Sequence, residues 1–184
     1  GASAPEAGRR LFGLSAVALS IWLVRYDVAR RTVRQEGLTR FMAVCLLSGY
    51  FWLGTAGALA LLAPGEFSGP VYDATLHALF VGFVFAMVFG HAPVIFPAVL
   101  GGSLAYRPRF YVHLGLLHAG LAMRLAGDLE SAWSLGIWGQ ARPWGGMLNA
   151  VAILLFLAST VASQSRRRWS SWTRTCGASC RSGS

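Results

Sequence analysis

Histidine is the residue type in this sequence best suited to chemistry inside a membrane, and it occurs only in or beside apolar stretches. Neutral imidazole is the commonest protein ligand for metal ions and also ligates haem iron. Ionisable groups are costly inside a bilayer and usually mark a binding site or a partnered pathway. The candidate ligands for haem b, copper or both are therefore His77, His91, His113 and His118.

The composition predicts an integral membrane protein surrounded by a lipid bilayer. Of 184 residues, 55% are hydrophobic and 12% are charged, whereas soluble domains carry about 25% charged residues. The net charge of +9 comes from arginine, since the sequence contains no lysine. The arginines cluster between apolar blocks, as in membrane proteins, and no nucleic-acid-binding motif is present. We therefore expect no nucleic-acid partner.

The apolar blocks predict an all-α, polytopic transmembrane bundle of about five helices. A span needs about 20 apolar residues. The first block is shorter, so it either spans the membrane or lies half-inserted, and the other four are expected to span. Residues 1–10 are expected to be the N-terminal segment of a fragment, and residues 169–184 a polar, disordered tail. The five predicted helices are 11–24, 41–63, 74–100, 111–125 and 147–161.

Arginine distribution predicts the orientation of this bundle. The segments 25–40, 106–109 and 166–168 are basic and alternate along the chain with 64–73 and 127–143, which hold few arginines. Arginine-rich loops face the cytoplasm. We therefore expect a multi-pass protein of the bacterial cytoplasmic (inner) membrane with a cytoplasmic C-terminus.

The predicted helix 74–100 has two distinct faces. Small residues recur every fourth position from Ala74, and such a stripe lets another helix approach closely. His77 and His91 lie within about 40° of each other on the opposite face, and Asp73 precedes His77 by one turn. Pro93 and Pro97 are expected to kink the end of this helix. The residues assigned to helix packing are Ala78, Gly82, Ala86 and Gly90.

Antiparallel packing of helix 111–125 brings its histidines to the level of His91. His113 and His118 are about 140° apart around that helix, so both are not expected to face one metal. His91 and His118 are the predicted metal ligands, while His113 caps the helix or meets headgroups and His77 lies near the outer surface with Asp73. Hydrogen bonding to neighbouring helices and a proton or ion path stay open as alternatives.

Residues 25–168 resemble the NnrS family and related membrane proteins similar to haem-copper oxidase subunit I. The resemblance is carried by RYDVARRTVRQEGLTRF, DATLHALFVGFVFAMVFGHAPVIFPAVLGG and YVHLGLLHAG. It implies a polytopic helical fold, a link to respiration or nitric-oxide stress, and roles for His77 and His91 and, less directly, His113 and His118. Family members have more helices, so the resemblance implies that this chain is a C-terminal portion whose missing helices, or another subunit, complete the bundle.

The departures from that pattern limit the function that can be expected. The sequence has neither His-His nor His-x-His, so oxygen or nitric-oxide reduction by this chain alone is unsupported, and no catalytic motif is present. The first expectation is a membrane protein that binds haem or copper through intramembrane histidines. The alternatives are a structural or assembly subunit without its own cofactor, and a fragment of a transporter, although no internal repeat is visible.

Overall fold

The computed structural model describes residues 4–63, 67–100, 108–133 and 140–179. It contains only helices in these ranges, which confirms the all-α prediction. The short α2 connects the first two long helices, and the π-helix η1 joins α4 and α5 into one continuous rod. The elements are α1 (Ala4–Tyr26), α2 (Ala29–Thr32), α3 (Gly37–Leu62), α4 (Gly69–His77), η1 (Ala78–Val84), α5 (Phe85–Leu100), α6 (Phe110–Trp133) and α7 (Ala141–Ser179).

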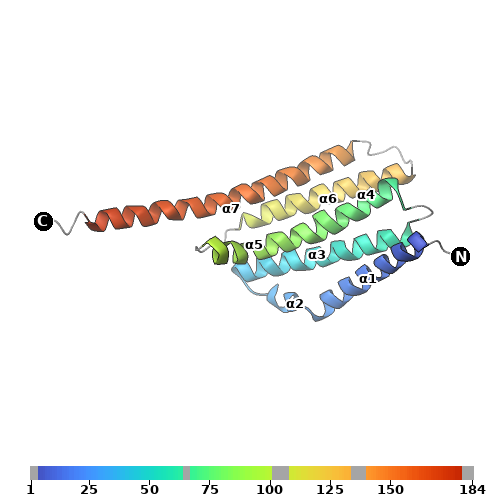
Figure 1. The fold of residues 1–184 in the computed structure, drawn as a ribbon, viewed down its shortest axis with the longest axis horizontal. Helices are drawn as coiled ribbons and strands as arrows, with labels where there is room; N and C mark the ends of the chain where they lie inside the picture. The colour runs from blue at the N-terminus through green and yellow to red at the C-terminus, as the bar shows by residue number, and fades with distance from the viewer. Residues whose placement is uncertain (1–3, 64–66, 101–107, 134–139, 180–184) are drawn as a thin grey trace.

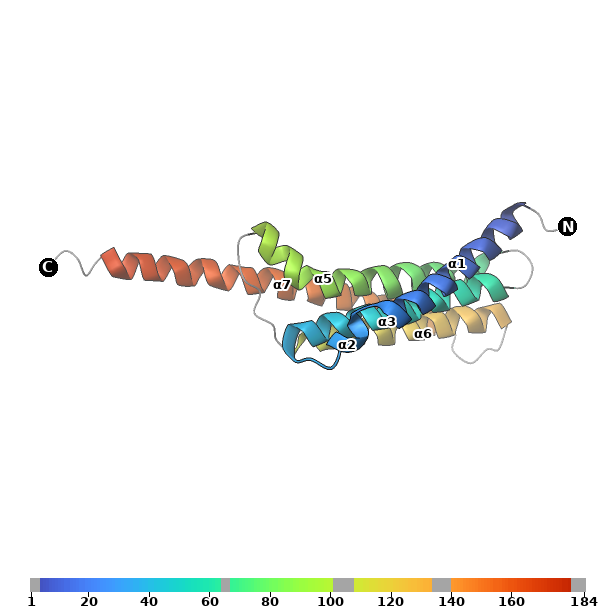
Figure 2. The same ribbon diagram turned by 90° about the horizontal axis from the view of Figure 1, so that it is seen from below.

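The long helices run side by side as an antiparallel bundle (Figure 1). The rod α4–η1–α5 packs against both α3 and α6, and α7 packs against α6. Helix α1 packs on α3 at the edge of the bundle, and the far part of α7 projects beyond the other helices (Figures 1 and 2). The inner helices are therefore α3, α6 and the rod.

Four helical segments are long and apolar enough to cross a membrane: Ala4–Tyr26, Gly37–Leu62, Gly69–Phe96 and Ala141–Thr160. The chain is thus a multi-pass membrane protein in a lipid bilayer. The first predicted span, which was the short one, belongs to this group because α1 extends toward the N-terminus as far as Ala4.

Helix α6 is not one of these four segments, although it is 24 residues long. Its two histidines and Arg124 lower its hydropathy. The polar side chains His113 and Asp128 are 4% and 0% exposed, so they face neighbouring helices. An inner helix can carry such residues because little of its surface faces lipid.

Helix α7 is longer than the predicted span 147–161. It continues as a helix to Ser179, through most of the segment that we expected to be a polar tail. Residues 147–176 contain neither proline nor glycine, so nothing in this sequence interrupts a helix once it has begun. Residues 180–184 of the predicted tail lie outside the described residues.

The small-residue stripe of the rod is buried along its whole length. Ala74, Ala78 and Ala86 are 0% exposed, and Gly82 and Gly90 are buried. In a continuous α-helix, a four-residue repeat drifts by about 40° per repeat. A π turn takes about one residue more than an α turn. The π-helix therefore offsets the drift and keeps the stripe against α3.

The end of the rod bends as the two prolines predict. Figure 2 shows the last turns of α5 turning away from the axis of the preceding helix. Proline removes a backbone hydrogen bond and clashes with the preceding turn.

Candidate functional site

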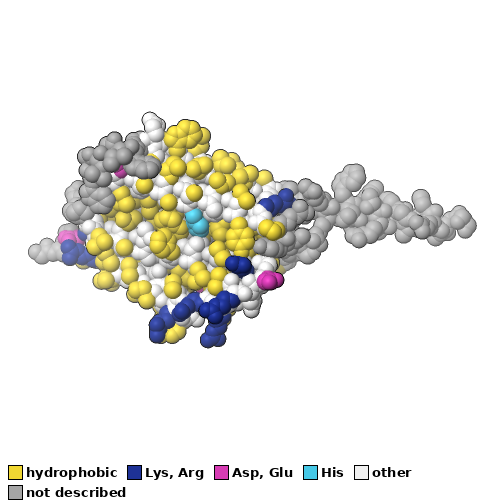
Figure 3. All heavy atoms as spheres, turned by 180° about the vertical axis from the view of Figure 1, so that it is seen from behind, with side chains coloured by type: hydrophobic (Ala, Val, Ile, Leu, Met, Phe, Trp, Pro, Cys, Tyr) yellow, Lys and Arg dark blue, Asp and Glu magenta, His cyan; other side chains and the backbone are white. Residues whose placement is uncertain are grey.

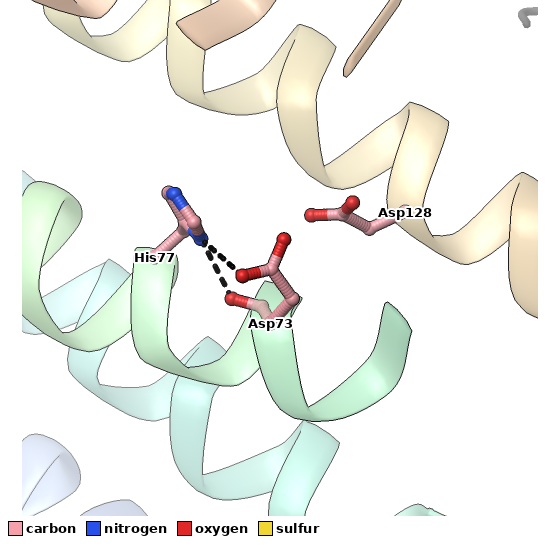
Figure 4. Close-up of side chains that lie close together, drawn as sticks. All are labelled: Asp73, His77 and Asp128. Carbon is pink, nitrogen blue, oxygen red and sulfur yellow. Dashed lines mark hydrogen bonds and ion pairs between the residues drawn. The ribbon is translucent and has the colours of Figure 1, made fainter. Parts of the chain in front are cut away.

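Charged side chains from three helices meet near one end of the bundle, and we call them the ionic cluster. Asp73 and His77 come from α4, Arg124 and Asp128 from α6, and Arg142 from the start of α7. Figure 4 shows the carboxylate of Asp128 directed across the helix interface toward Asp73. The cluster therefore joins α4, α6 and α7 through charge.

The two arginines of the ionic cluster bridge its two carboxylates. Arg124 Nη2 donates to Asp73 Oδ2 at 2.6 Å, and Arg142 Nη2 donates to the same oxygen at 3.3 Å. On the other side, Arg142 Nε lies 2.5 Å from Asp128 Oδ1 and Arg124 Nε lies 3.7 Å from Asp128 Oδ2. Two negative and two positive groups thus balance one another around Asp128, which is 0% exposed.

His77 is the imidazole member of the ionic cluster. Its Nδ1 lies 2.8 Å from the backbone oxygen of Asp73 and 3.4 Å from Asp73 Oδ1. A carbonyl oxygen only accepts hydrogen bonds, so Nδ1 carries a proton, and in the neutral ring Nε2 keeps its lone pair. Figure 4 shows this second nitrogen pointing away from both carboxylates. The predicted contact between His77 and Asp73 is present.

Asp73, His77 and Asp128 also place ligand atoms within 4.8 Å of one another, close enough for a metal ion. A divalent cation prefers such carboxylate oxygens and imidazole. Here, however, both carboxylates are already neutralised by Arg124 and Arg142. A cation at this point would have to displace both guanidinium groups, so the geometry favours an ion-pair network over a metal centre.

His118 is held by a tryptophan of α3. Trp52 Nε1 donates to His118 Nδ1 at 3.0 Å. An accepting Nδ1 places the proton of the neutral ring on Nε2, and this buried N–H has no hydrogen-bond partner among the described residues. His118 in this state offers no lone pair to a metal.

His113 is enclosed by aromatic rings. The centroids of Phe89, Phe110 and Phe156 lie 5.4, 5.5 and 5.4 Å from its ring centroid. The side chain is 4% exposed, so it is a core residue of the interface among α5, α6 and α7. The predicted role at a helix cap or among headgroups is therefore wrong, because the residue faces inward.

His91 differs from the other three histidines because its side chain is exposed. Its Nδ1 lies 2.8 Å from the backbone oxygen of Met87. Nδ1 must therefore carry a proton, and in the neutral ring Nε2 keeps its lone pair. The backbone contact holds the ring in place on the outer face of α5.

The structure does not bring the predicted ligands together. Of the four histidines, only His77 belongs to a group of three or more metal-ligating side chains within the described ranges. Gly90, beside His91, packs on Cys45, whereas His118 contacts Trp52. Cys45 and Trp52 both belong to α3, where they are seven residues, or about 10 Å, apart along the helix. His91 and His118 therefore lie at different depths.

The sequence prediction missed most of the ionic cluster. It placed Asp128 and Arg142 in a loop after residue 127, whereas α6 continues through Asp128 to Trp133 and α7 begins at Ala141. The spacing of Arg124 and Asp128 was the available signal, since oppositely charged residues four apart share a helix face.

Fold and site together define a multi-pass helical membrane protein with an ion-pair network around a buried carboxylate and one outward-facing histidine. Residues 1–165 match the model of a family described as a domain of unknown function (DUF8744). The chain belongs to this family. No curated protein and no solved structure matches it.

Proposed function

We propose that this chain is a subunit of a bacterial cytoplasmic membrane complex that presents His91 as a ligand for haem or copper. The supporting observation is the state of its ring. A histidine that binds a metal usually donates its other N–H to a carboxylate or a backbone carbonyl, and His91 makes this contact with Met87 at 2.8 Å. The lone pair of Nε2 is left available at the surface.

The surroundings of His91 support a role beyond packing. It lies within the candidate span Gly69–Phe96, and its neighbours Val88, Val94 and Ile95 are 44%, 50% and 54% exposed. A polar imidazole on an apolar membrane surface is costly unless it meets a partner group. The exposed side chain therefore suits a contact with a cofactor or with another subunit.

A cofactor held by His91 needs its remaining ligands from outside the described residues. His118 carries its proton on Nε2, and His113 is enclosed by phenylalanines. A haem between two histidines of this bundle does not fit this arrangement. We propose that another subunit or further transmembrane helices supply the second ligand, and the resemblance to the NnrS family favours a role in respiration or nitric-oxide stress.

The cofactor proposal is tested by purifying the tagged protein from its native membrane in mild detergent, so that its partners are retained. We expect a haem Soret band or stoichiometric copper, lowered at least tenfold per chain in His91→Ala. The matched control His118→Ala should keep the cofactor content of the unchanged protein. No Soret band and no stoichiometric iron or copper, or equal contents in both variants, would contradict the proposal.

A second candidate is an assembly subunit without its own cofactor. The ionic cluster favours it, because its two arginines neutralise both carboxylates and leave the charge inside the bundle balanced. On this account, His91→Ala and His118→Ala both retain the partner subunits seen with the unchanged protein. Loss of partners together with cofactor in His91→Ala alone would favour the first proposal.

We also propose that the C-terminus of α7 is cytoplasmic. The end of the bundle that carries α2 has exposed arginines at positions 25, 30, 31, 34 and 40, and arginine-rich loops stay in the cytoplasm. Helix α7 begins at the opposite end of the bundle, beside the ionic cluster, and runs toward the α2 end.

A green fluorescent protein fused to the C-terminus should fluoresce, and alkaline phosphatase fused there should be inactive. The reverse result would invert the orientation.

A further inference from the structure

The end of the bundle that carries α2 has a strongly basic surface, which we call the basic turn. No carboxylate in the described part of the chain forms an ion pair with any of its arginines. The segment holds two acidic residues, Asp27 and Glu36. The carboxylate of Asp27 accepts hydrogen bonds from the hydroxyl of Tyr50 at 2.7 Å and from the backbone N–H of Ala29 at 2.7 Å. The members of the basic turn are Arg25, Arg30, Arg31, Arg34 and Arg40, all exposed.

Figure 3 shows basic side chains gathered at the edge of the molecule formed by α1 and α2, directly below a broad hydrophobic surface. Exposed apolar side chains accompany the arginines in the sequence, with Trp22, Tyr26 and Val28 at 57%, 68% and 64% exposed. Aromatic residues beside positive charge are typical of the boundary between lipid tails and headgroups. The basic turn therefore lies at headgroup level.

A groove opens next to the basic turn, between the first turns of α3 and the start of α6. It is lined by Glu36, Gly37, Arg40, Val44 and Tyr111. Arg40 and Val44 are one helical turn apart, so the groove passes from a guanidinium group to an apolar side chain as it enters the bundle. This order of charge and apolar surface matches a lipid headgroup followed by its acyl chain.

We propose that this groove binds an anionic phospholipid, with its phosphate on Arg40 and an acyl chain along Val44. The other arginines of the basic turn attract anionic headgroups to the same surface, as basic pockets between membrane helices do. The carboxylate of Glu36 opposes the phosphate and weakens the site. The inference does not depend on His91 or on any cofactor.

The test is native mass spectrometry of the full chain with phosphatidylglycerol, and with phosphatidylcholine as the zwitterionic reference. Phosphatidylglycerol should bind in preference, and Arg40→Gln should weaken it about fivefold. Glu36→Gln should tighten it. The control Arg10→Gln, at the start of α1 and the other end of the bundle, should leave the affinity unchanged, and circular dichroism in phosphatidylcholine should show that every variant keeps its helices.

Equal affinity for the two lipids, or equal loss in Arg40→Gln and Arg10→Gln, would show that the groove has no specific role. Millimolar inorganic phosphate should not displace the bound lipid, because the acyl chain contributes to binding. Displacement by phosphate would mean a simple anion site instead.

Discussion

Asp128→Asn is expected to destabilise the protein by about 2 kcal/mol, because it removes the charge of a fully buried carboxylate from the ion-pair network and leaves Asp73 as the counter-charge of Arg124 and Arg142. Asp128 is 0% exposed, and its carboxylate lies 2.5 Å from Arg142 Nε and 3.7 Å from Arg124 Nε. The substitution keeps the size and shape of the side chain, removes its charge and replaces one acceptor oxygen with an amide donor. The free energy of unfolding in mixed detergent micelles measures the loss.

A double-mutant cycle separates the ion pair from simple loss of packing. Asp128→Asn combined with Arg142→Gln should cost clearly less than the sum of the two single changes, since each removes the partner of the other. The control is Glu6→Gln, which breaks the pair of Glu6 with Arg10, whose side chains are 33% and 59% exposed. Exposed pairs are worth less than about 1 kcal/mol. Strict additivity at residues 128 and 142 would show that the ionic cluster does not stabilise the bundle.

The membrane fold could be predicted from the sequence because its signal is local. Long apolar blocks bounded by arginine and proline define where helices lie, and the small residues from Ala78 to Gly90 define which face of the rod packs. These features depend on neighbours in the chain. The start of α1 was harder to predict, because the Ala4–Arg10 segment contains charged residues and yet is helical. This segment packs beside α3, where Arg9 donates to the backbone oxygens of Ala60 and Ala63.

The candidate site could be predicted only in part, because it depends on helix rotation and on contacts between distant residues. The π-helix η1 changes the rotation between His77 and His91, so one histidine joins the ionic cluster and the other is exposed. The prediction that both lie on one face of the helix is wrong for this reason. Likewise, the bond from Trp52 sets the proton position on His118, and no spacing within the sequence reveals that contact.

The close contact between α6 and α7 explains how Asp128 and Arg142 come within bonding distance. At Gly145, an added Cβ would lie 2.6 Å from the backbone nitrogen of Arg124 and 2.6 Å from the backbone oxygen of Gly120. Backbone atoms cannot move aside as a flexible side chain can. The absence of a side chain at Gly145 therefore sets the distance between the two helices, one turn from Arg142.

Gly145→Ala is accordingly expected to push α7 away from α6 and to cost about 3 kcal/mol, the upper range for overpacking a well-packed interface. It should also lower the coupling measured between Asp128 and Arg142, because Arg142 moves with α7. Gly115→Ala on α6 is the matched control, since nothing lies within 4 Å of a Cβ added there; it should be neutral or slightly stabilising, because alanine favours helix. Equal stability of the two variants would mean that α6 and α7 do not pack this closely, and the ionic cluster would then need another explanation.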